Sequence, residues 1–221
     1  MKFSVLISVY YKENPKYLQI SLESIWDNQT LKPSQIVLVK DGGLGNKLES
    51  IIELWQKRLG NILKVIPIAE NVGLGNALNI GLEYCDYEYI ARMDSDDISV
   101  PNRFDNQIGY LIQNPNIDIV GGFINEFGFK NGLIKYPLKN NSMRQYFAKR
   151  NPVAHVTVMF RKSFFIKAGY YPTDTLLNED SILWLNGFKS NCHFANIPQV
   201  FVQVRVNKNT FYRRNNFKKV F

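Results

Sequence analysis

The sequence predicts an α/β fold, with a mostly parallel central sheet flanked by helices in a single domain. In its first half, short apolar segments rich in β-branched residues alternate with segments whose apolar residues recur every three to four positions. Acidic residues follow the ends of several of the short apolar segments. Alternating strands and helices favour a parallel sheet covered on both faces. Such sheets bind ligands at the carboxyl ends of their strands, which is where these acids are expected.

The first half predicts four strands and three helices. The strands are expected at residues 3–9, 36–39, 63–68 and 87–93. Asn14 and Pro15 supply an N-cap and a first-turn proline for the first helix. Its apolar stripe consists of Leu18, Leu22, Ile25 and Trp26. A second helix is expected to end at Gly60, and a third to cover residues 74–84.

The second half is less regular. A helix at 103–112, closed by Asn114 and Pro115, precedes a strand at 118–127 and a turn at 130–132 that leads into a further short strand. Residues 153–160 predict another strand, and residues 180–186 the beginning of a helix. No repeat or linker interrupts the pattern before residue 205, so we expect one domain over residues 1–204.

The composition excludes several classes of protein. The 221 residues are 45% hydrophobic and 21% charged, as in globular domains, which excludes disordered, collagen-like and low-complexity chains. Cys85 and Cys192 form neither a disulfide framework nor a metal-binding spacing, which indicates a reducing compartment. No run reaches the ~18 apolar residues of a membrane-spanning helix. The first apolar segment is expected to be a core strand rather than a signal peptide.

The net charge of +8 is concentrated at the end of the chain. Residues 205–221 contain no acid and six basic residues: Arg205, Lys208, Arg213, Arg214, Lys218 and Lys219. The first 204 residues therefore carry only about +2 in total. A basic tail of this kind attracts nucleic acid, anionic lipid or an acidic polymer. Because no nucleic-acid-binding motif accompanies it, nucleic acid is not an expected partner.

The sharpest functional motif is Asp94-Ser95-Asp96-Asp97, which follows the fourth expected strand. Alternate carboxylates in a turn can converge on Mg²⁺ or Mn²⁺, with a diphosphate completing the ligand set. The alternative is that these acids only cap a turn and a helix. Arg92 shares a strand face with Asp94, where it could balance the acids or bind a phosphate.

A glycine-rich segment follows the third expected strand. Gly73 and Gly75 would need a third glycine at position 78 for a dinucleotide fingerprint, but that residue is Leu78, so a Rossmann dehydrogenase is disfavoured. Asn71, Gly73 and Asn79 could still line a nucleotide pocket at a helix N-terminus. Simple capping of the helix by Asn71 is the alternative.

Two further motifs carry titratable groups in the second half. Glu179 and Asp180 precede Trp184, and a carboxylate there could serve as a general base for a hydroxyl acceptor. The alternative is a helix whose first turn favours acids. His155 is either a structural histidine or a ligand-binding one.

Together these motifs resemble the family 2 inverting glycosyltransferases, which have the nucleotide-sugar-binding GT-A fold. The matching segments are residues 4–10, 37–42, 71–79, 90–97, 101–104 and 179–180. The resemblance is closer to bacterial enzymes of amylovoran-type exopolysaccharide, capsule and O-antigen synthesis. That likeness depends on residues 90–104, 157–160 and 204–206. Ala154 departs from it, since relatives often have asparagine before the histidine.

The resemblance implies an inverting hexosyltransferase that uses Mn²⁺ or Mg²⁺. It would move galactose, glucose or an N-acetylhexosamine from a UDP-sugar to a lipid-linked saccharide, undecaprenyl-diphosphate-linked or lipopolysaccharide-type, and form a β linkage. Residues 1–100 would bind the nucleotide and residues 101–204 the acceptor. The basic tail at 205–221 would touch the inner face of the bacterial plasma membrane, which implies a cytoplasmic, peripheral protein. A catalytically idle binding protein of the same fold is the alternative.

The resemblance also implies roles for individual residues. Asp41 would hold the uracil ring. Nucleotide-sugar contacts would come from Asn71, Gly73, Asn79, Arg92, Asp94, Ser95, Asp96 and His155. Asp94 and above all Asp96 would face the metal. Asp180 would be the catalytic base, with Glu179 as a second candidate. Supporting roles would fall to Asp97, Arg103 and Trp184.

Overall fold

The computed structural model describes residues 1–175 and 178–208. Its N-terminal half contains the seven helices and strands that the sequence predicts, with slightly different ends. They are β1 (Phe3–Tyr10), α1 (Pro15–Ile25), β2 (Gln35–Asp41), α2 (Asn46–Leu59), β3 (Leu63–Ile68), α3 (Leu74–Glu83) and β4 (Tyr89–Asp94). The side chain of Asn14 caps α1 by accepting a 2.9 Å hydrogen bond from the Lys16 N–H, as expected of an N-cap residue. Gly60 ends α2 with a φ of +55°, which favours glycine.

The C-terminal half contains more elements than the sequence predicts. They are β5 (Ile98–Ser99), α4 (Arg103–Gln113), β6 (Ile119–Gly128), β7 (Gly132–Ile134), α5 (Asn140–Phe147), β8 (Met159–Arg161), α6 (Ser163–Ala168), α7 (Glu179–Lys189) and β9 (Phe194–Val206). Of these, β5, α5, α6 and β9 are not predicted. The predicted strand at 153–160 is wrong over most of its length. A 3₁₀ turn, His155–Thr157, occupies its middle, and only β8 extends there.

All the strands join one nine-stranded sheet in the order β3-β2-β1-β4-β8-β6-β9-β5, with β7 paired to β6. The first four neighbours run parallel, as the alternation of strands and helices predicts. Beyond β4 the sheet is mixed, because β8 is antiparallel to both β4 and β6, while β6 and β9 are parallel. The parallel arrangement therefore dominates only the N-terminal half.

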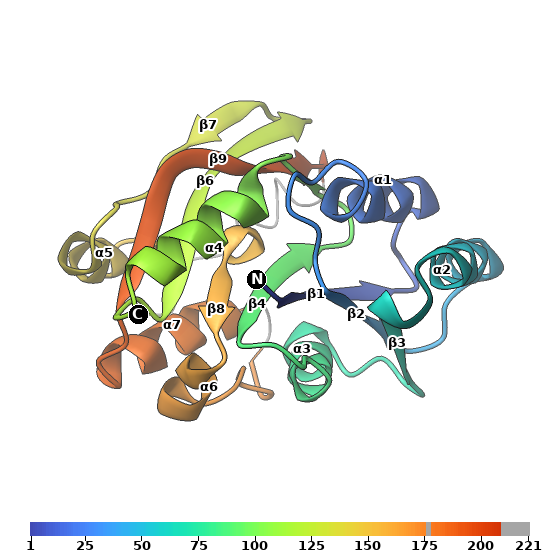
Figure 1. The fold of residues 1–221 in the computed structure, drawn as a ribbon, viewed down its shortest axis with the longest axis horizontal. Helices are drawn as coiled ribbons and strands as arrows, with labels where there is room; N and C mark the ends of the chain where they lie inside the picture. The colour runs from blue at the N-terminus through green and yellow to red at the C-terminus, as the bar shows by residue number, and fades with distance from the viewer. Residues whose placement is uncertain (176–177, 209–221) are drawn as a thin grey trace.

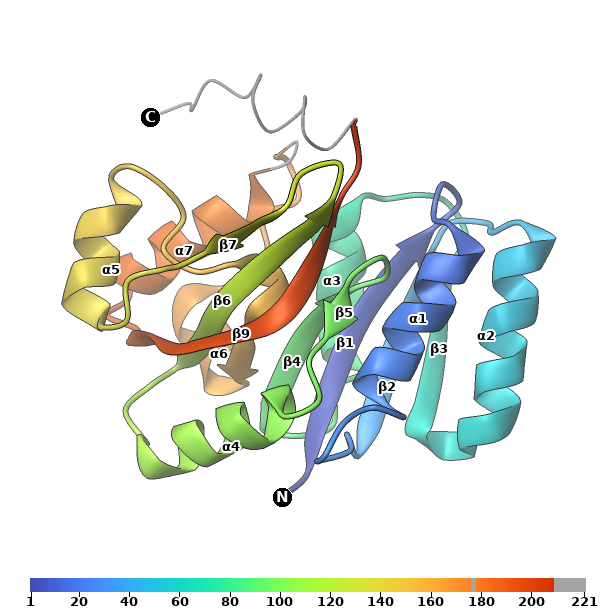
Figure 2. The ribbon, with the colours of Figure 1, turned by 90° about the horizontal axis from the view of Figure 1, so that it is seen from above.

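Helices cover both faces of the sheet (Figures 1 and 2). Successive residues of β1 and β2 point to opposite faces. One buried cluster joins Ile36 and Leu38 of β2 to residues of α1, α2 and α4. The other joins Val37 and Val39 to residues of α3, α5, α6 and α7. The two clusters explain why the strand of residues 35–41 is apolar without alternation.

Two further observations concern the cysteines and the length of the helices. Cys85 and Cys192 are both free thiols and both buried. Within the described residues, the structure contains no helix long and apolar enough to cross a membrane.

Candidate active site

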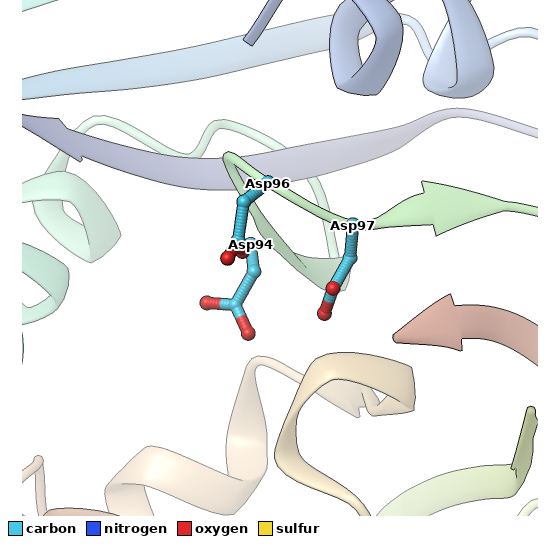
Figure 3. Close-up of side chains that lie close together, drawn as sticks. All are labelled: Asp94, Asp96 and Asp97. Carbon is cyan, nitrogen blue, oxygen red and sulfur yellow. The ribbon is translucent and has the colours of Figure 1, made fainter. Parts of the chain in front are cut away.

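The candidate site lies at the carboxyl ends of β2 and β4, which flank β1. The register pairs Tyr10 with Asp41 and Ser8 with Asp94, so both acids reach the same edge of the sheet. Residues 94–97, which we call the acid turn, leave β4 at this point. Carboxylate oxygens of Asp94, Asp96 and Asp97 lie within 4.8 Å of one another (Figure 3). The predicted convergence of these acids is therefore seen in the structure.

Within the acid turn, the three carboxylates have different partners. Asp94 forms an ion pair with Arg92, whose guanidinium is almost fully buried. Asp97 is also buried and accepts a 2.7 Å hydrogen bond from the backbone N–H of Arg205. Among the described residues, the Asp96 carboxylate has no hydrogen bond to another residue. Burial and the nearby carboxylates of Asp94 and Glu13 raise the pKa of Asp96 to about 7.

Two residues that the sequence analysis does not single out for the site, Glu13 and Arg205, stand beside the acid turn. Glu13 accepts a 2.7 Å hydrogen bond from the Ser95 hydroxyl. Arg205 donates from Nε to the Asp96 carbonyl at 3.1 Å. Its guanidinium lies 3.8 Å from the ring centroid of Tyr17 and 4.6 Å from that of Phe127. The sequence predicts Arg205 as the first residue of a tail, but the structure places it inside β9.

Asp41 holds the loop that follows β3. Its Oδ1 accepts a 2.7 Å hydrogen bond from the Val72 N–H, and its Oδ2 accepts a 3.0 Å bond from the Asn71 side chain. Gly42 has a φ of +86°, and an added Cβ there would lie 2.8 Å from the Asn71 nitrogen. Close approach of the two loops therefore requires glycine at position 42. The side chain of Asn71 faces Asp41 rather than capping α3.

The helix α3 begins at this loop, and its glycines serve backbone geometry and packing. Gly73 is the N-cap, with a φ of +84°. At Gly75 a Cβ would lie 2.7 Å from the carbonyl oxygen of Pro172. Asn79 donates to the Tyr171 carbonyl at 2.8 Å and accepts from the Tyr171 N–H at 2.9 Å. Asn79 thus fixes the segment at Tyr171, and its predicted contact with a nucleotide stays a prediction.

His155 lies in a buried aromatic group. Its Nε2 is 2.8 Å from the hydroxyl of Tyr171, and its ring meets the Trp184 ring edge-on at a centroid distance of 5.8 Å. Burial, together with the positive charge of Arg92, lowers the pKa of His155 well below its usual value, so the ring is neutral at pH 7. Tyr171 is a further residue that the sequence analysis does not single out, because nothing in the sequence distinguishes it from Tyr170.

The carboxylate of Asp180 faces this group from the first turn of α7. Its Oδ1 accepts from the Ser181 N–H at 2.7 Å, and its Oδ2 accepts from the Asn151 side chain at 2.9 Å. Burial raises the pKa of Asp180 to about 6, and Glu179 adds to this, while the Ser181 N–H and Arg92 oppose it. Glu179 is itself buried, against α3 at Gly75.

Two of the predicted supporting residues, Arg103 and Trp184, belong to the buried interior. Arg103 is fully buried and donates to the Arg92 carbonyl at 2.7 Å and to Gln107 Oε1 at 3.0 Å, which ties α4 to β4. Burial, followed by the charge of Arg92, lowers the pKa of Arg103 to about 9. Trp184 is fully buried, and its indole N–H has no hydrogen-bond partner among the described residues.

Arg92 links the two ends of this region electrostatically. Beside its ion pair with Asp94, its positive charge partly opposes the effect of burial, which raises the pKa of both Asp96 and Asp180. Beside the acid turn, a shallow cleft of about 450 Å³ is lined by Glu13 together with residues that follow β1 and begin α2. The arrangement combines a cluster of carboxylates that could hold a cation, a buried guanidinium and a separate carboxylate with a pKa of about 6.

Known proteins with related sequences are sugar transferases. The family model for glycosyl transferase family 2 matches residues 4–170. The amylovoran biosynthesis glycosyltransferase AmsE of Erwinia amylovora is 40% identical over 99% of this chain and 81% of its own length. The Escherichia coli UDP-Gal:α-D-GlcNAc-diphosphoundecaprenol β-1,3-galactosyltransferase is 36% identical over 98% of this chain and 78% of its own.

A solved structure shows the same fold at lower identity. Residues 1–349 of S. aureus TarS, crystallised with UDP, superpose with a TM-score of 0.76 and 20% sequence identity. The match covers 96% of this chain and 63% of the TarS chain. With the family match over residues 4–170 and the two relatives above 30% identity, the chain belongs to glycosyl transferase family 2 and has the GT-A fold.

Proposed function

We propose that the chain transfers a hexose from a UDP-sugar to a hydroxyl of a lipid-linked saccharide in bacterial surface polysaccharide synthesis. The observation that carries this proposal is the acid turn, where three carboxylates lie within 4.8 Å of one another and Asp94 is paired with buried Arg92. Such a site can hold a diphosphate at one end and activate a hydroxyl at the other. The activity for which the E. coli relative is named supports a galactose donor and an undecaprenyl-diphosphate-linked acceptor.

The donor is expected to bind at the edge of the sheet formed by β1, β2 and β4. Residues 1–100 then form the nucleotide-binding half and residues 101–204 the acceptor-binding half. Asp41, whose oxygens accept hydrogen bonds from residues 71 and 72, would accept a further one from a uracil N–H. The cleft next to Glu13 is suited to the nucleoside, and UDP in the TarS crystal supports this class of donor.

The acid turn fits Mn²⁺ or Mg²⁺. Its donors are carboxylate oxygens within 4.8 Å of one another, and these ions prefer such ligands. Asp96 and Asp94 would hold the ion, whereas Asp97 is committed to the backbone of Arg205. When bound, such an ion neutralises charge that develops on a departing diphosphate. The guanidinium of Arg92 is placed to bind the same phosphates.

We assign the proton transfer to Asp180. An acceptor hydroxyl attacks the anomeric carbon, its proton passes to the Asp180 carboxylate, and the bond from that carbon to the UDP oxygen breaks. A single displacement of this kind inverts the anomeric centre, so an α-linked donor gives a β-linked product. With a pKa of about 6, Asp180 is largely ionised at pH 7 and still basic enough to accept a proton. Glu179 is the second candidate.

The tail is proposed to contact anionic membrane at the cytoplasmic face, close to a lipid-linked acceptor. Arg213, Arg214, Lys218 and Lys219 lie outside the described residues. Deleting residues 209–221 is expected to weaken cosedimentation with vesicles of acidic lipid, since four positive charges are lost. Unchanged cosedimentation would reject this role.

The proposed function is tested by screening UDP-sugars against a synthetic undecaprenyl-diphosphate-sugar analogue in the presence of Mn²⁺. We expect transfer from one hexose donor with inverted stereochemistry, and its loss when EDTA is in excess. Binding of UDP without turnover of any donor would favour a catalytically idle member of the family. Full activity in EDTA would reject the metal assignment but leave the transferase assignment in place.

A further inference from the structure

The near balance of charge in residues 1–204 conceals a strongly basic segment. Residues 127–151 contain six basic residues and no aspartate or glutamate. The six are Lys130, Lys135, Lys139, Arg144, Lys149 and Arg150. Residues 1–126, in contrast, contain more acidic than basic residues. Positive charge is therefore gathered in one part of the folded domain as well as in the tail.

This segment comprises the last two residues of β6, the turn after it, β7, α5 and the turn that follows α5. Both β7 and α5 lie in the half of the molecule away from α2 and β3 (Figures 1 and 2). Lys130 is paired with Glu126 at 3.3 Å, and Arg144 lies over the Phe188 ring. Lys135, Lys139, Lys149 and Arg150 are exposed, and no described residue offers them a carboxylate within 4.0 Å.

Large apolar side chains are exposed between these lysines. Phe129 is 53% exposed, Leu133 50% and Leu138 40%. A single exposed leucine needs no explanation, because folded proteins expose many apolar atoms. Three such residues interleaved with lysines, and with no acid between them, are typical of a surface that enters the head-group region of a membrane.

Both ends of the segment adjoin the active site. At its start, Phe127 pairs with Arg205 in the sheet, and the Arg205 N–H donates to Asp97. At its end, Asn151 donates to Asp180. The segment therefore begins next to the acid turn and ends next to the candidate base, while its middle packs against the start of β9.

We propose that residues 128–150 form a docking face for an anionic lipid bilayer. The lysines attract acidic head groups, and Phe129, Leu133 and Leu138 enter the boundary between head groups and acyl chains. A nucleic acid would use the same lysines but would leave the exposed aliphatic side chains without a partner. The biological reason for this docking face rests on the proposed function. A lipid-linked acceptor would be presented at the surface of a membrane.

The first test compares two triple variants of the full chain that lose the same charge. Lys135→Gln, Lys139→Gln and Lys149→Gln alter the docking face, whereas Lys2→Gln, Lys16→Gln and Lys57→Gln alter exposed lysines of the N-terminal half. Partitioning is measured on vesicles of phosphatidylcholine with phosphatidylglycerol, and on phosphatidylcholine alone. We expect about a tenfold or greater loss on the acidic vesicles for the first variant and less than about a twofold loss for the second. Equal losses would overturn the proposal.

A second test separates lipid from other polyanions. Leu133→Ser removes an exposed apolar side chain and no charge, so it is expected to weaken vesicle binding about threefold or more. Binding of a single-stranded oligonucleotide should not change in this variant. If Leu133→Ser leaves vesicle binding intact while the lysine variant loses oligonucleotide and vesicle binding equally, the face is a general polyanion site and the lipid assignment is wrong.

Vesicle binding is measured without donor or acceptor, so it does not depend on activity. Transfer to a short water-soluble acceptor analogue is measured separately, and the docking-face variants are expected to keep it, since none of their residues lies in the catalytic machinery. If no donor is turned over but the lysine variant still loses vesicle binding, the proposed function is wrong and the docking-face proposal is supported. If transfer is found but the lysine variant binds vesicles like wild type, only the docking-face proposal is wrong.

Discussion

The side-chain amide of Asn151 donates a 2.9 Å hydrogen bond to Oδ2 of Asp180, which joins the turn after α5 to the first turn of α7. This bond stabilises the ionised carboxylate. Asn151→Ala is therefore expected to raise the pKa of Asp180 above about 6 and to move the acid limb of the kcat/KM profile upward by about one pH unit. Asn106→Ala, which removes a half-buried amide of α4 that donates to Gln199, is the control. An unmoved acid limb in Asn151→Ala would contradict the base assignment.

Asp180→Asn keeps the size of the side chain and removes its ability to accept a proton. We expect transfer to fall by roughly 10²–10⁴-fold, the usual contribution of a general base. Binding of UDP with Mn²⁺, measured by calorimetry, should stay close to wild type, because the acid turn is untouched. Near-normal transfer by this variant would shift the assignment to Glu179, which Glu179→Gln would then test.

Asp96→Asn is expected to stabilise the fold while it removes a ligand of the proposed cation site. The pKa of Asp96 is raised from its ordinary 3.8 to about 7, so the native state binds this proton more tightly than the unfolded chain does. The free energy of unfolding therefore falls as the pH rises from about 4 to about 7. Removing the charge should add roughly 1 to 3 kcal/mol at pH 8 and almost nothing near pH 4.

Urea unfolding at the two pH values measures this difference, with exposed Asp105→Asn as the control. Wild type should gain further stability from Mn²⁺ and UDP together, and Asp96→Asn should not. A variant that is less stable than wild type at pH 8 without ligands would show that the ionised Asp96 carboxylate does not destabilise the fold.

Tyr171→Phe is expected to destabilise the protein by about 1 kcal/mol, because it leaves Nε2 of half-buried His155 without its partner. Tyr170→Phe is a matched control, since Tyr170 is the next residue along and is 56% exposed. Its unfolding free energy should stay within about 0.5 kcal/mol of wild type. Equal stabilities of the two variants would mean that the hydrogen bond between Tyr171 and His155 contributes nothing.

Arg205→Met tests whether β9 positions the acid turn. The substitution keeps much of the apolar stem but removes the bond to the Asp96 carbonyl and the guanidinium between two aromatic rings. Binding of Mn²⁺ with UDP is expected to weaken about tenfold, the scale seen when residues that orient metal ligands are changed. Lys208→Met, three residues further on and exposed, should leave binding unchanged. Equal binding by both variants would deny Arg205 this role.

The sequence predicts the N-terminal half well because its strands and helices are regular and locally specified. Caps such as Asn14 and Gly60 mark the ends of its helices. The miss at β9 has a physical cause. The first part of that strand contains Pro198 and pairs with β6 through shifts of register around Phe123, which obscures the strand there. Residues 202–206 do alternate apolar and polar side chains, and that strand signal was available in the sequence.

Residues of the candidate site were likewise predictable only where the local sequence marks them. Asp94 and Asp96 were predictable because they follow a strand directly, in a spacing suited to a cation. Asn151, Tyr171 and Arg205 reach the site only through contacts between distant parts of the chain, and their own sequence surroundings carry no signal of that role. The apolar run at 153–160 was misleading because full burial looks the same in a strand and in a 3₁₀ turn.

The position of Arg205 has a practical consequence for anyone who attaches the protein to a sensor chip, a fluorophore or a fusion partner. β9 ends at Val206, one residue after Arg205, whose side chain donates to the Asp96 carbonyl. A force applied just after this strand would therefore be transmitted to the acid turn. β1 begins at Phe3, at the opposite end of the parallel strands, so an attachment before residue 3 would leave the reacting groups undisturbed and facing away from the support.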